Sequence, residues 1–241
     1  MLFPFANALA EEAAEIVQAA EETAETAEAA VETVAKAPKG FIERMASNGQ
    51  YFWIAFGVVI ALGVILLVIG LSRKKWTAKT VAFGALSIAL SFALSYIRLF
   101  RMPQGGAVTP GSMLPIMLFS AAFGVGPGLA AGVVYGVLQY LQGGWFANVW
   151  QVLLDYILAF GALGLAGLAK HLPEKWGLYA AMILAALGRA LSATLAGIMF
   201  WDTAPWASLV YNGTYLIPEV IICIILAFLI AKPVMKVMKA K

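Results

Sequence analysis

The stretch Gly143–Lys170 has the length of a membrane-spanning helix, yet it carries a carboxylate, Asp155. A carboxylate inside hydrocarbon costs about 2.5–3.5 kcal/mol on insertion scales, so Asp155 should face protein or a water-lined cavity. At about 1.5 Å per residue, it lies about 12 Å from a helix start near Ala147. The stretch therefore predicts a pocket open to one membrane face, or else an interhelical hydrogen bond from a protonated Asp155.

Polar and aromatic side chains accompany this carboxylate. Asn148, Gln151 and Asp155 are separated by three and four residues, which puts them on one side of a helix. Trp145 and Tyr156 add aromatic surface beside them. A pocket of tryptophan, tyrosine and carboxylate suits a flat cation, held by cation–π contacts and charge pairing. The sequence therefore predicts an aromatic or heterocyclic ligand with a positive charge.

The overall composition defines the class of protein. Of the 241 residues, 62% are hydrophobic, and the mean hydropathy is +0.87. A soluble fold could not bury that much apolar surface. We therefore expect an all-α, polytopic membrane protein with one main domain.

Few residue types in the chain support catalysis or metal binding. Cys223 is the only cysteine and His171 the only histidine, which argues against disulfides, cysteine-ligated zinc and histidine-based metal sites. The sequence contains no GxSxG elbow, no Walker-type phosphate loop and no paired metal-binding carboxylates. We therefore expect no enzyme or ATPase, no metal or cofactor, and no nucleic-acid partner.

The chain divides into several predicted regions. Residues 1–50 form an acidic, Ala/Glu-rich extension, in which 11–36 favour a solvated helix or spacer, or else a partner-binding arm. Residues 51–72 hold an uncharged apolar run that is long enough for an extra transmembrane helix. Residues 76–235 form the main membrane domain, and 236–241 form a basic tail.

Apolar segments predict the helices of the main domain. In chain order these are 80–99, 113–123, 129–141, 143–170, 176–201 and 207–230. We expect 124–128 to be a turn and Pro218 to kink the last helix. Within these helices, polar side chains mark faces turned away from lipid. They are Tyr135, Gln139 and Gln142 in the third, Arg189 in the fifth, and Asn212, Tyr215 and Glu219 in the last.

Basic residues predict the orientation of the chain. If Arg73–Lys75 is cytoplasmic, the later helices bring Lys170, Lys175 and the C-terminal lysines to the same side, as the positive-inside rule requires. The C-terminus is then cytoplasmic, and the N-terminal extension and Trp145 lie outside. We therefore expect a multi-pass protein of a bacterial plasma membrane, with its pocket open to the outer face.

The segment 98–112 is dense in glycine and proline and too polar to face lipid. It predicts a structured loop or lid. The residues expected at its tip are Met102, Pro103, Gln104, Gly105 and Gly106.

Small residues form a narrow stripe on the first helix of the main domain. Ala85, Ala89 and Ala93 recur at intervals of four, with Ala82 on the same face. Such a stripe permits close helix–helix approach in a membrane. It predicts either packing within the bundle or a docking surface for a partner.

Several segments together carry a resemblance to a known family. They are RMPQGGAVTPGSMLPI (101–116), GVVYGVLQ (132–139), QVLLDYILAFGALGLAG (151–167) and AGIMFW with LVYNGTYLIPE (196–219). The order and spacing of these segments resemble the thiamine-specific substrate-binding (S) subunits of energy-coupling-factor (ECF) transporters, the ThiT/YuaJ family. The resemblance covers about residues 76–235.

The resemblance implies a six-helix bundle, here preceded by an extra transmembrane helix, that captures thiamine for ATP-driven uptake. Energy would come from partners, namely a transmembrane coupling subunit and two ATPases. In the family, an alanine stripe on the first helix meets the coupling subunit, and Ala85, Ala89 and Ala93 stand at that place. The loop after that helix closes over the bound vitamin.

Individual site residues follow from the resemblance and from the faces described above. The acidic residue facing the ligand corresponds to Asp155, followed by Tyr156; a pocket tryptophan corresponds to Trp201, and a basic residue to Arg189. The remaining expected ligand-binding residues are Gln151, Trp145, Tyr211, Asn212, Tyr135 and Glu219.

The chain departs from the family pattern at two places. Relatives carry a histidine one turn after the basic residue, where this chain has Ala193. The first 75 residues have no counterpart in the family. Two alternatives therefore stay open, a subunit for a thiamine precursor or analogue and a structural or regulatory membrane protein without transport function.

Overall fold

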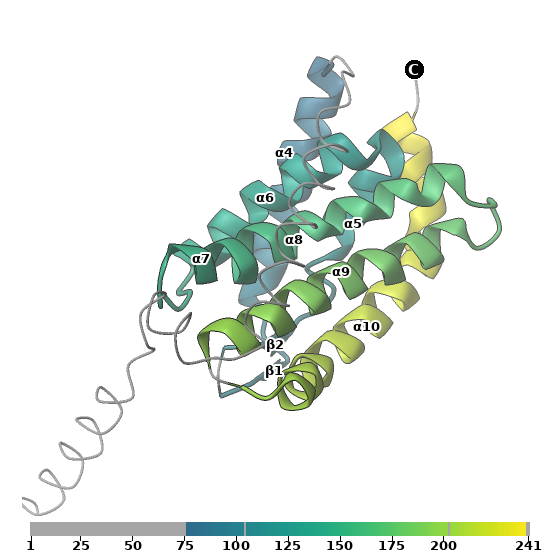
Figure 1. Ribbon diagram of the computed structural model, residues 1–241. Coiled ribbons are helices and arrows are strands. Elements are labelled where there is room, and N and C mark those ends of the chain that lie inside the picture. The colour runs from purple at the N-terminus through teal and green to yellow at the C-terminus, as the bar shows by residue number, and fades with distance from the viewer. Residues whose placement is uncertain (1–75, 104, 202, 240–241) are drawn as a thin grey trace, which may run out of the picture. The chain divides into compact units, whose positions relative to one another are not determined.

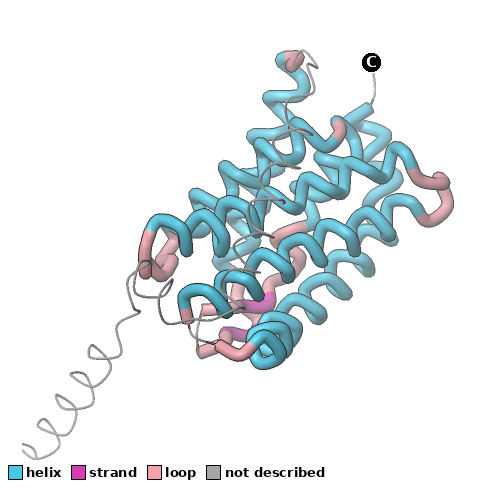
Figure 2. Tube along the Cα trace, in the orientation of Figure 1, coloured by secondary structure: helices cyan, strands magenta, loops and turns pink. Residues whose placement is uncertain are grey.

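The main domain is built from long apolar helices, shown in one orientation as a ribbon in Figure 1 and as a tube in Figure 2. The computed structural model describes residues 76–103, 105–201 and 203–239, so the predicted extension 1–50 and extra helix 51–72 lie outside it. Four described helices are long and apolar enough to cross a membrane, and two more are shorter. The long ones are α4 (Ala78–Tyr96), the continuous helical segment Val149–His171, α9 (Gly177–Phe200) and α10 (Pro205–Lys239).

The short helix α5 (Leu114–Phe123) forms the centre of the bundle. Every residue from Leu114 to Ala122 is buried, and α5 contacts the helices on all sides of it. A helix that is apolar all round is stable only when its neighbours cover it. Pro115 lies in its first turn, where the missing N–H has no helical partner to lose.

The predicted turn at 124–128 is wrong. Helix α6 (Val125–Leu141) begins directly after α5, and Gly124 alone separates the two. Gly124 has φ = 109°, which is accessible to glycine and strained for other residues. Pro127 fits the first turn of α6 for the same reason as Pro115 in α5. The last helix also runs further than expected, because α10 continues through Pro218 and Pro233 to Lys239 and includes the start of the predicted tail.

The organising segment Val149–His171 is not a uniform α-helix. It consists of α7 (Val149–Val152), the π-helix η1 (Leu153–Leu158), α8 (Ala159–Gly161) and the 3-10 helix η2 (Ala162–His171). Its start, capped by Asn148, lies close to the predicted start near Ala147. A single π turn inside an α-helix often coincides with a functional site, and η1 contains Asp155 and Tyr156.

Close glycine contacts join α6 to this segment. Gly128, Gly132 and Gly136 recur at intervals of four on α6. A Cβ atom added to Gly132 would lie 2.3 Å from the carbonyl oxygen of Phe160, and one on Gly136 would lie 2.3 Å from that of Tyr156. The two backbones therefore touch, as small residues at helix interfaces permit.

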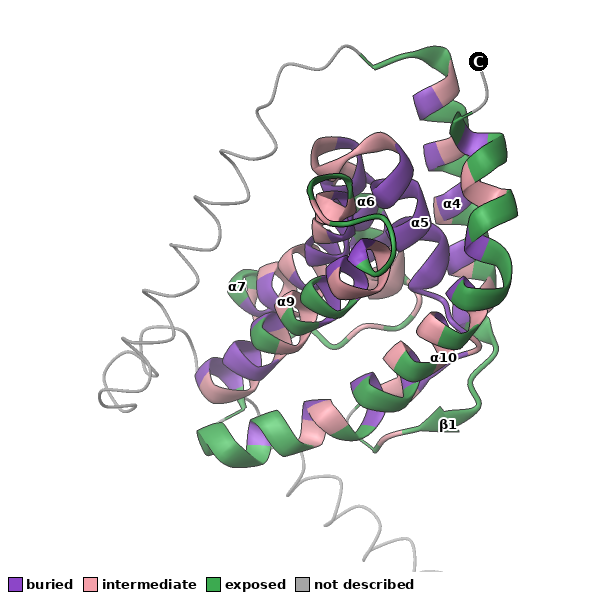
Figure 3. Cartoon of the chain, turned by 90° about the vertical axis from the view of Figure 1, so that its right-hand side faces the viewer, coloured by how far each residue is buried: buried purple, intermediate pink, exposed green. Residues whose placement is uncertain are grey.

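Helix α4 has two faces of small residues, one buried in the bundle and one exposed (Figure 3). Gly84, Ser87, Ser91 and Ser95 are buried against α5 and α6. The alanine stripe at 82, 85, 89 and 93 is exposed on the described part of the molecule. The serine face, rather than the alanine stripe, therefore makes the packing within the bundle.

The segment predicted as a lid contains a short hairpin between α4 and α5. Strands β1 (Phe100–Arg101) and β2 (Ala107–Val108) pair antiparallel, with Phe100 opposite Val108 and Arg101 opposite Ala107. A hydrogen bond from Gly105 N to Met102 O closes its turn at 3.1 Å. The hairpin packs on α10.

Candidate functional site

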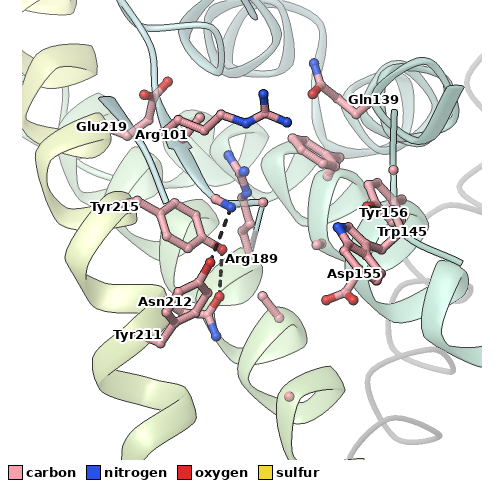
Figure 4. Close-up of a pocket in the computed structure, with 18 of the residues that line it drawn as sticks. Arg101, Gln139, Trp145, Asp155, Tyr156, Arg189, Tyr211, Asn212, Tyr215 and Glu219 are labelled. Atoms are coloured by element: carbon pink, nitrogen blue, oxygen red, sulfur yellow. Dashed lines mark hydrogen bonds between the residues drawn. The ribbon is translucent and has the colours of Figure 1, made fainter. Parts of the chain in front are cut away.

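A cavity of about 660 Å³ opens between α6, η1, α9, α10 and the hairpin. Figure 4 shows Trp145, Asp155 and Tyr156 on one side, with Tyr211, Asn212, Tyr215 and Glu219 opposite. Every residue that the sequence predicted to bind ligand lines this cavity. They are Tyr135, Trp145, Gln151, Asp155, Tyr156, Arg189, Trp201, Tyr211, Asn212 and Glu219.

A short chain of hydrogen bonds orients Asp155. The backbone N–H of Ala147 donates to Gln151 Oε1 at 3.2 Å, and Gln151 Nε2 donates to Asp155 Oδ2 at 2.7 Å. A backbone N–H can only donate, so the Gln151 atom that faces Ala147 must be the amide oxygen and the one that faces Asp155 the amide nitrogen. Asn148 does not share this face as expected, because it precedes the helix and its Oδ1 accepts from Gln151 N at 3.0 Å. Gln151 therefore holds the carboxylate in place.

Aromatic rings surround Asp155. Trp145 and Trp201 pack edge to face with centroids 5.8 Å apart, and both are partly exposed at the mouth of the cavity. The hydroxyl of Tyr156 accepts a hydrogen bond from Trp145 N at 3.0 Å, which holds the loop before α7 against η1. A carboxylate beside tryptophan rings is suited to a planar cation.

The floor of the cavity contains a buried aromatic pair and a cation. The guanidinium of Arg189 lies 4.3 Å from the ring centroid of Phe160. Phe160 packs edge to face with Tyr135 at 5.0 Å, and the Tyr135 hydroxyl donates to Ser91 O at 3.4 Å. The ring of Phe160 therefore supports the guanidinium of Arg189 through a cation–π contact.

Helix α10 contributes a polar wall. The Tyr215 hydroxyl donates to Asn212 Oδ1 at 2.6 Å, and Asn212 Nδ2 donates to Ser208 O at 2.9 Å. Asn212 and Tyr215 are both buried, whereas Tyr211 is partly exposed. The predicted shared face of Asn212, Tyr215 and Glu219 is thus present, with its first two members bonded to each other.

Glu219 contacts the hairpin segment rather than standing alone in the cavity. Its carboxylate accepts hydrogen bonds from the backbone N–H and the hydroxyl of Thr109, and from Ser112 Oγ at 3.3 Å. The side chain is 2% exposed. Charge-assisted bonds of this kind are stronger than neutral ones, so Glu219 fixes the end of the predicted lid to α10.

The tip of the hairpin covers the cavity beside Tyr211. Pro103, Gly105 and Gly106 line the cavity, whereas Met102 packs against the small cluster of Val108, Tyr215 and Leu216. Gly106 N donates to the Tyr211 hydroxyl at 3.4 Å. Gln104, also predicted in the lid, lies outside the described residues.

Further lining residues were not identified from the sequence as ligand-binding. Arg98 and Arg101 line the cavity from the hairpin side, and Arg101 reaches across it in Figure 4. Gln139 and Gln142 line it from α6, on the face that the sequence predicted to be polar. Charged residues are rare in the membrane domain and tend to mark functional sites, so their charge alone could have identified Arg98 and Arg101.

Comparisons with known proteins agree with one another. The model of the thiamine transporter protein family (Thia_YuaJ) matches residues 81–239. The thiamine transporter ThiT of Bacillus subtilis is 34% identical over 158 residues, which span 58% of this chain and 82% of that protein.

A solved structure shares the fold. ThiT from Listeria monocytogenes superposes with a TM-score of 0.57 at 21% identity, covering 66% of this chain and 96% of the other. With the family match over most of the described residues, this likeness leads to one assignment. The chain belongs to the thiamine transporter protein family, whose members are membrane transport proteins and not enzymes.

Proposed function

We propose that this chain is the substrate-binding subunit of an ECF-type importer, and that it captures thiamine in the cavity beside Asp155. The observation that carries the proposal is that the side chains chosen from the sequence for a flat cation surround a single cavity of about 660 Å³. That volume lies within the range of small-molecule sites. Thiamine combines a cationic ring with an aminopyrimidine, which matches the charge and the aromatic lining.

Each wall of the cavity has a proposed role. Asp155, oriented by Gln151, pairs with the cationic or amino-bearing part of the ligand. Trp145 and Trp201 supply aromatic surface for cation–π contact. The hairpin, attached to α10 through Glu219, acts as the lid. Exclusion of water beneath the lid strengthens the charge interactions.

The chain holds no energy source of its own among the described residues, so uptake requires partners. We propose that Ala85, Ala89 and Ala93 dock a transmembrane coupling subunit, which works with two ATPase subunits. The exposure of this stripe on α4 supports the idea, since a close partner helix needs small side chains. The proposed orientation has an outward pocket, a cytoplasmic C-terminus, and 51–72 as an extra anchor before the six-helix domain.

Equilibrium binding of thiamine to the purified protein tests the proposal. Trp145 and Trp201 lie at the cavity, so saturable quenching of tryptophan fluorescence and a rise in melting temperature are expected. Trp201→Phe is the matched control that should reduce the quenching signal. Absence of both signals would favour a structural or regulatory protein.

Competition experiments separate thiamine from its relatives. Beyond Arg189, the α9 side of the cavity carries only the small residues Ala193 and Gly197, which favours a ligand with a larger ring substituent as the second candidate. A precursor or analogue that displaces thiamine at a lower concentration than thiamine itself would identify that compound as the preferred ligand.

A further inference from the structure

The cavity is lined by four carboxamide side chains, two of which have both ends bonded within the protein. Gln151 uses both ends of its amide, on Ala147 and Asp155. Asn212 likewise uses both ends, on Ser208 and Tyr215. One end of the Gln142 amide lies 3.0 Å from Ser95 Oγ. Gln151 and Asn212 are therefore fixed at both ends of the amide, whereas Gln142 is held at one end.

Gln139 differs from Gln151 and Asn212. Its Nε2 atom is buried and has no hydrogen-bond partner within the described part of the chain, although the residue lines the cavity. Gln142 Nε2 is also buried without a partner among the described residues, but the other end of that amide accepts a hydrogen bond from Ser95. Figure 4 places Gln139 on the side of Tyr156 and Asp155, facing the wall that Tyr215 and Glu219 form. A buried amide donor without a partner is costly and uncommon in native proteins, so its presence at a cavity indicates a ligand group.

The chemistry of a carboxamide indicates which ligand group this is. An amide offers a donor and an acceptor side by side, and glutamine uses both on the amino group and ring nitrogen of adenine. A 4-aminopyrimidine presents the same edge, an exocyclic amino group next to a ring nitrogen. We propose that Gln139 recognises the aminopyrimidine edge of the ligand through such a paired hydrogen bond. This inference rests on the proposed function.

The placement of the other groups in the cavity agrees with this role for Gln139. The carboxylate of Asp155 lies beside Trp145 and Trp201, a setting for the cationic ring. On α9, Ala193 and Gly197 line the cavity without a side-chain hydrogen-bonding group, and the guanidinium of Arg189 lies over the ring of Phe160. Tyr135, one turn before Gln139, adds aromatic surface to the same region. An elongated ligand with its cation near Asp155 can therefore extend its neutral ring toward Gln139.

A ligand that lacks only the aminopyrimidine edge tests the proposal. In 3-benzyl-5-(2-hydroxyethyl)-4-methylthiazolium, a phenyl ring replaces the aminopyrimidine, while the cation and the hydroxyethyl group stay. Gln139→Met keeps the shape of the side chain and removes the amide. We expect this variant to bind thiamine roughly tenfold to a hundredfold more weakly, and the benzyl compound as tightly as the wild type does.

The controls separate failure of this inference from failure of the proposed function. Leu138→Met, one residue away and outside the cavity lining, should change neither affinity. Equal weakening of both ligands by Gln139→Met would show that the residue supports the cavity or contacts the hydroxyethyl end, and would overturn the inference. Unchanged thiamine affinity in that variant would overturn it as well. A wild-type protein that binds no thiamine would overturn the proposed function first.

Discussion

Gln151 donates a 2.7 Å hydrogen bond to Asp155, one turn further along the same helical segment. The bond spans the junction between α7 and the π-helix η1, because Gln151 lies in α7 and Asp155 lies in η1. Because Gln151 is 1% exposed, its amide has no freedom to turn away. Asp155 therefore keeps one orientation toward the cavity.

Asp155→Asn is expected to weaken thiamine binding by about 2–5 kcal/mol, since it removes one charge of a desolvated pair while keeping the size of the side chain. Titration calorimetry would measure the loss, and the circular dichroism spectrum should be unchanged. Tight binding by the Asn variant would show that Asp155 makes only a structural hydrogen bond.

Gly136→Ala is expected to destabilise the fold by about 1–3 kcal/mol, because the new Cβ would lie 2.3 Å from the carbonyl oxygen of Tyr156. The π-helix would have to move, so thiamine affinity should fall too. Gly161→Ala is the matched control, since a Cβ there meets Val133 at 3.4 Å. Equal melting temperatures for the two variants would contradict the close contact.

Gly105→Val with Gly106→Val is expected to weaken binding through a poorly closed lid. Gly105 has φ = 102°, and a Cβ on Gly106 would lie 2.5 Å from the ring of Tyr215. Hydrogen exchange across 101–112 should slow in the wild type when thiamine is added. The same exchange with and without saturating thiamine would mean that the hairpin is a fixed rim.

Glu219→Met is expected to speed hydrogen exchange at Thr109 and Ser112, because it removes the acceptor that holds both residues to α10. The loss of a buried acceptor should destabilise this segment by about 1–3 kcal/mol. Thiamine should bind more weakly and dissociate faster. If exchange is unchanged while affinity falls, Glu219 acts by direct contact with the ligand instead.

Ala89→Trp is expected to abolish uptake by the assembled transporter and to leave thiamine binding by the isolated subunit intact. A bulky residue on the exposed stripe blocks close approach of a partner helix, far from the cavity lining. Leu90→Trp, exposed on the same helix at the edge of the stripe, is the control. Transport assays in cells would separate them, and equal uptake would remove the docking role.

The side chains that line the cavity could be predicted from the sequence better than the backbone around them. Asp155, Arg189 and Asn212 could be identified because polar groups are costly in a membrane and therefore mark a cavity. The π-helix could not be predicted, because a single π turn is too short to change the apolar periodicity that an α-helix of this length would show. The turn expected at 124–128 was wrong for a local reason. Glycine and proline signal breaks in general, yet Pro127 fits a first helical turn.

Other features depended on tertiary contacts. The hairpin strands have two residues each, and they are held by α10 rather than by their own propensity. The attachment of Glu219 to Thr109 joins residues far apart in the chain, which no local pattern indicates. The unpartnered amide of Gln139 became meaningful only when its neighbours were known.

The glycine contacts between α6 and the segment Val149–His171 also bear on how sequences of this kind can diverge. Where Gly132 and Gly136 touch backbone carbonyl oxygens, a larger residue would clash, so these positions of α6 have almost no freedom to vary. The α9 wall is different, because Ala193 already has a side chain and faces open space in the cavity. Changes of ligand preference among related chains should therefore accumulate on α9, while α6 keeps its glycines.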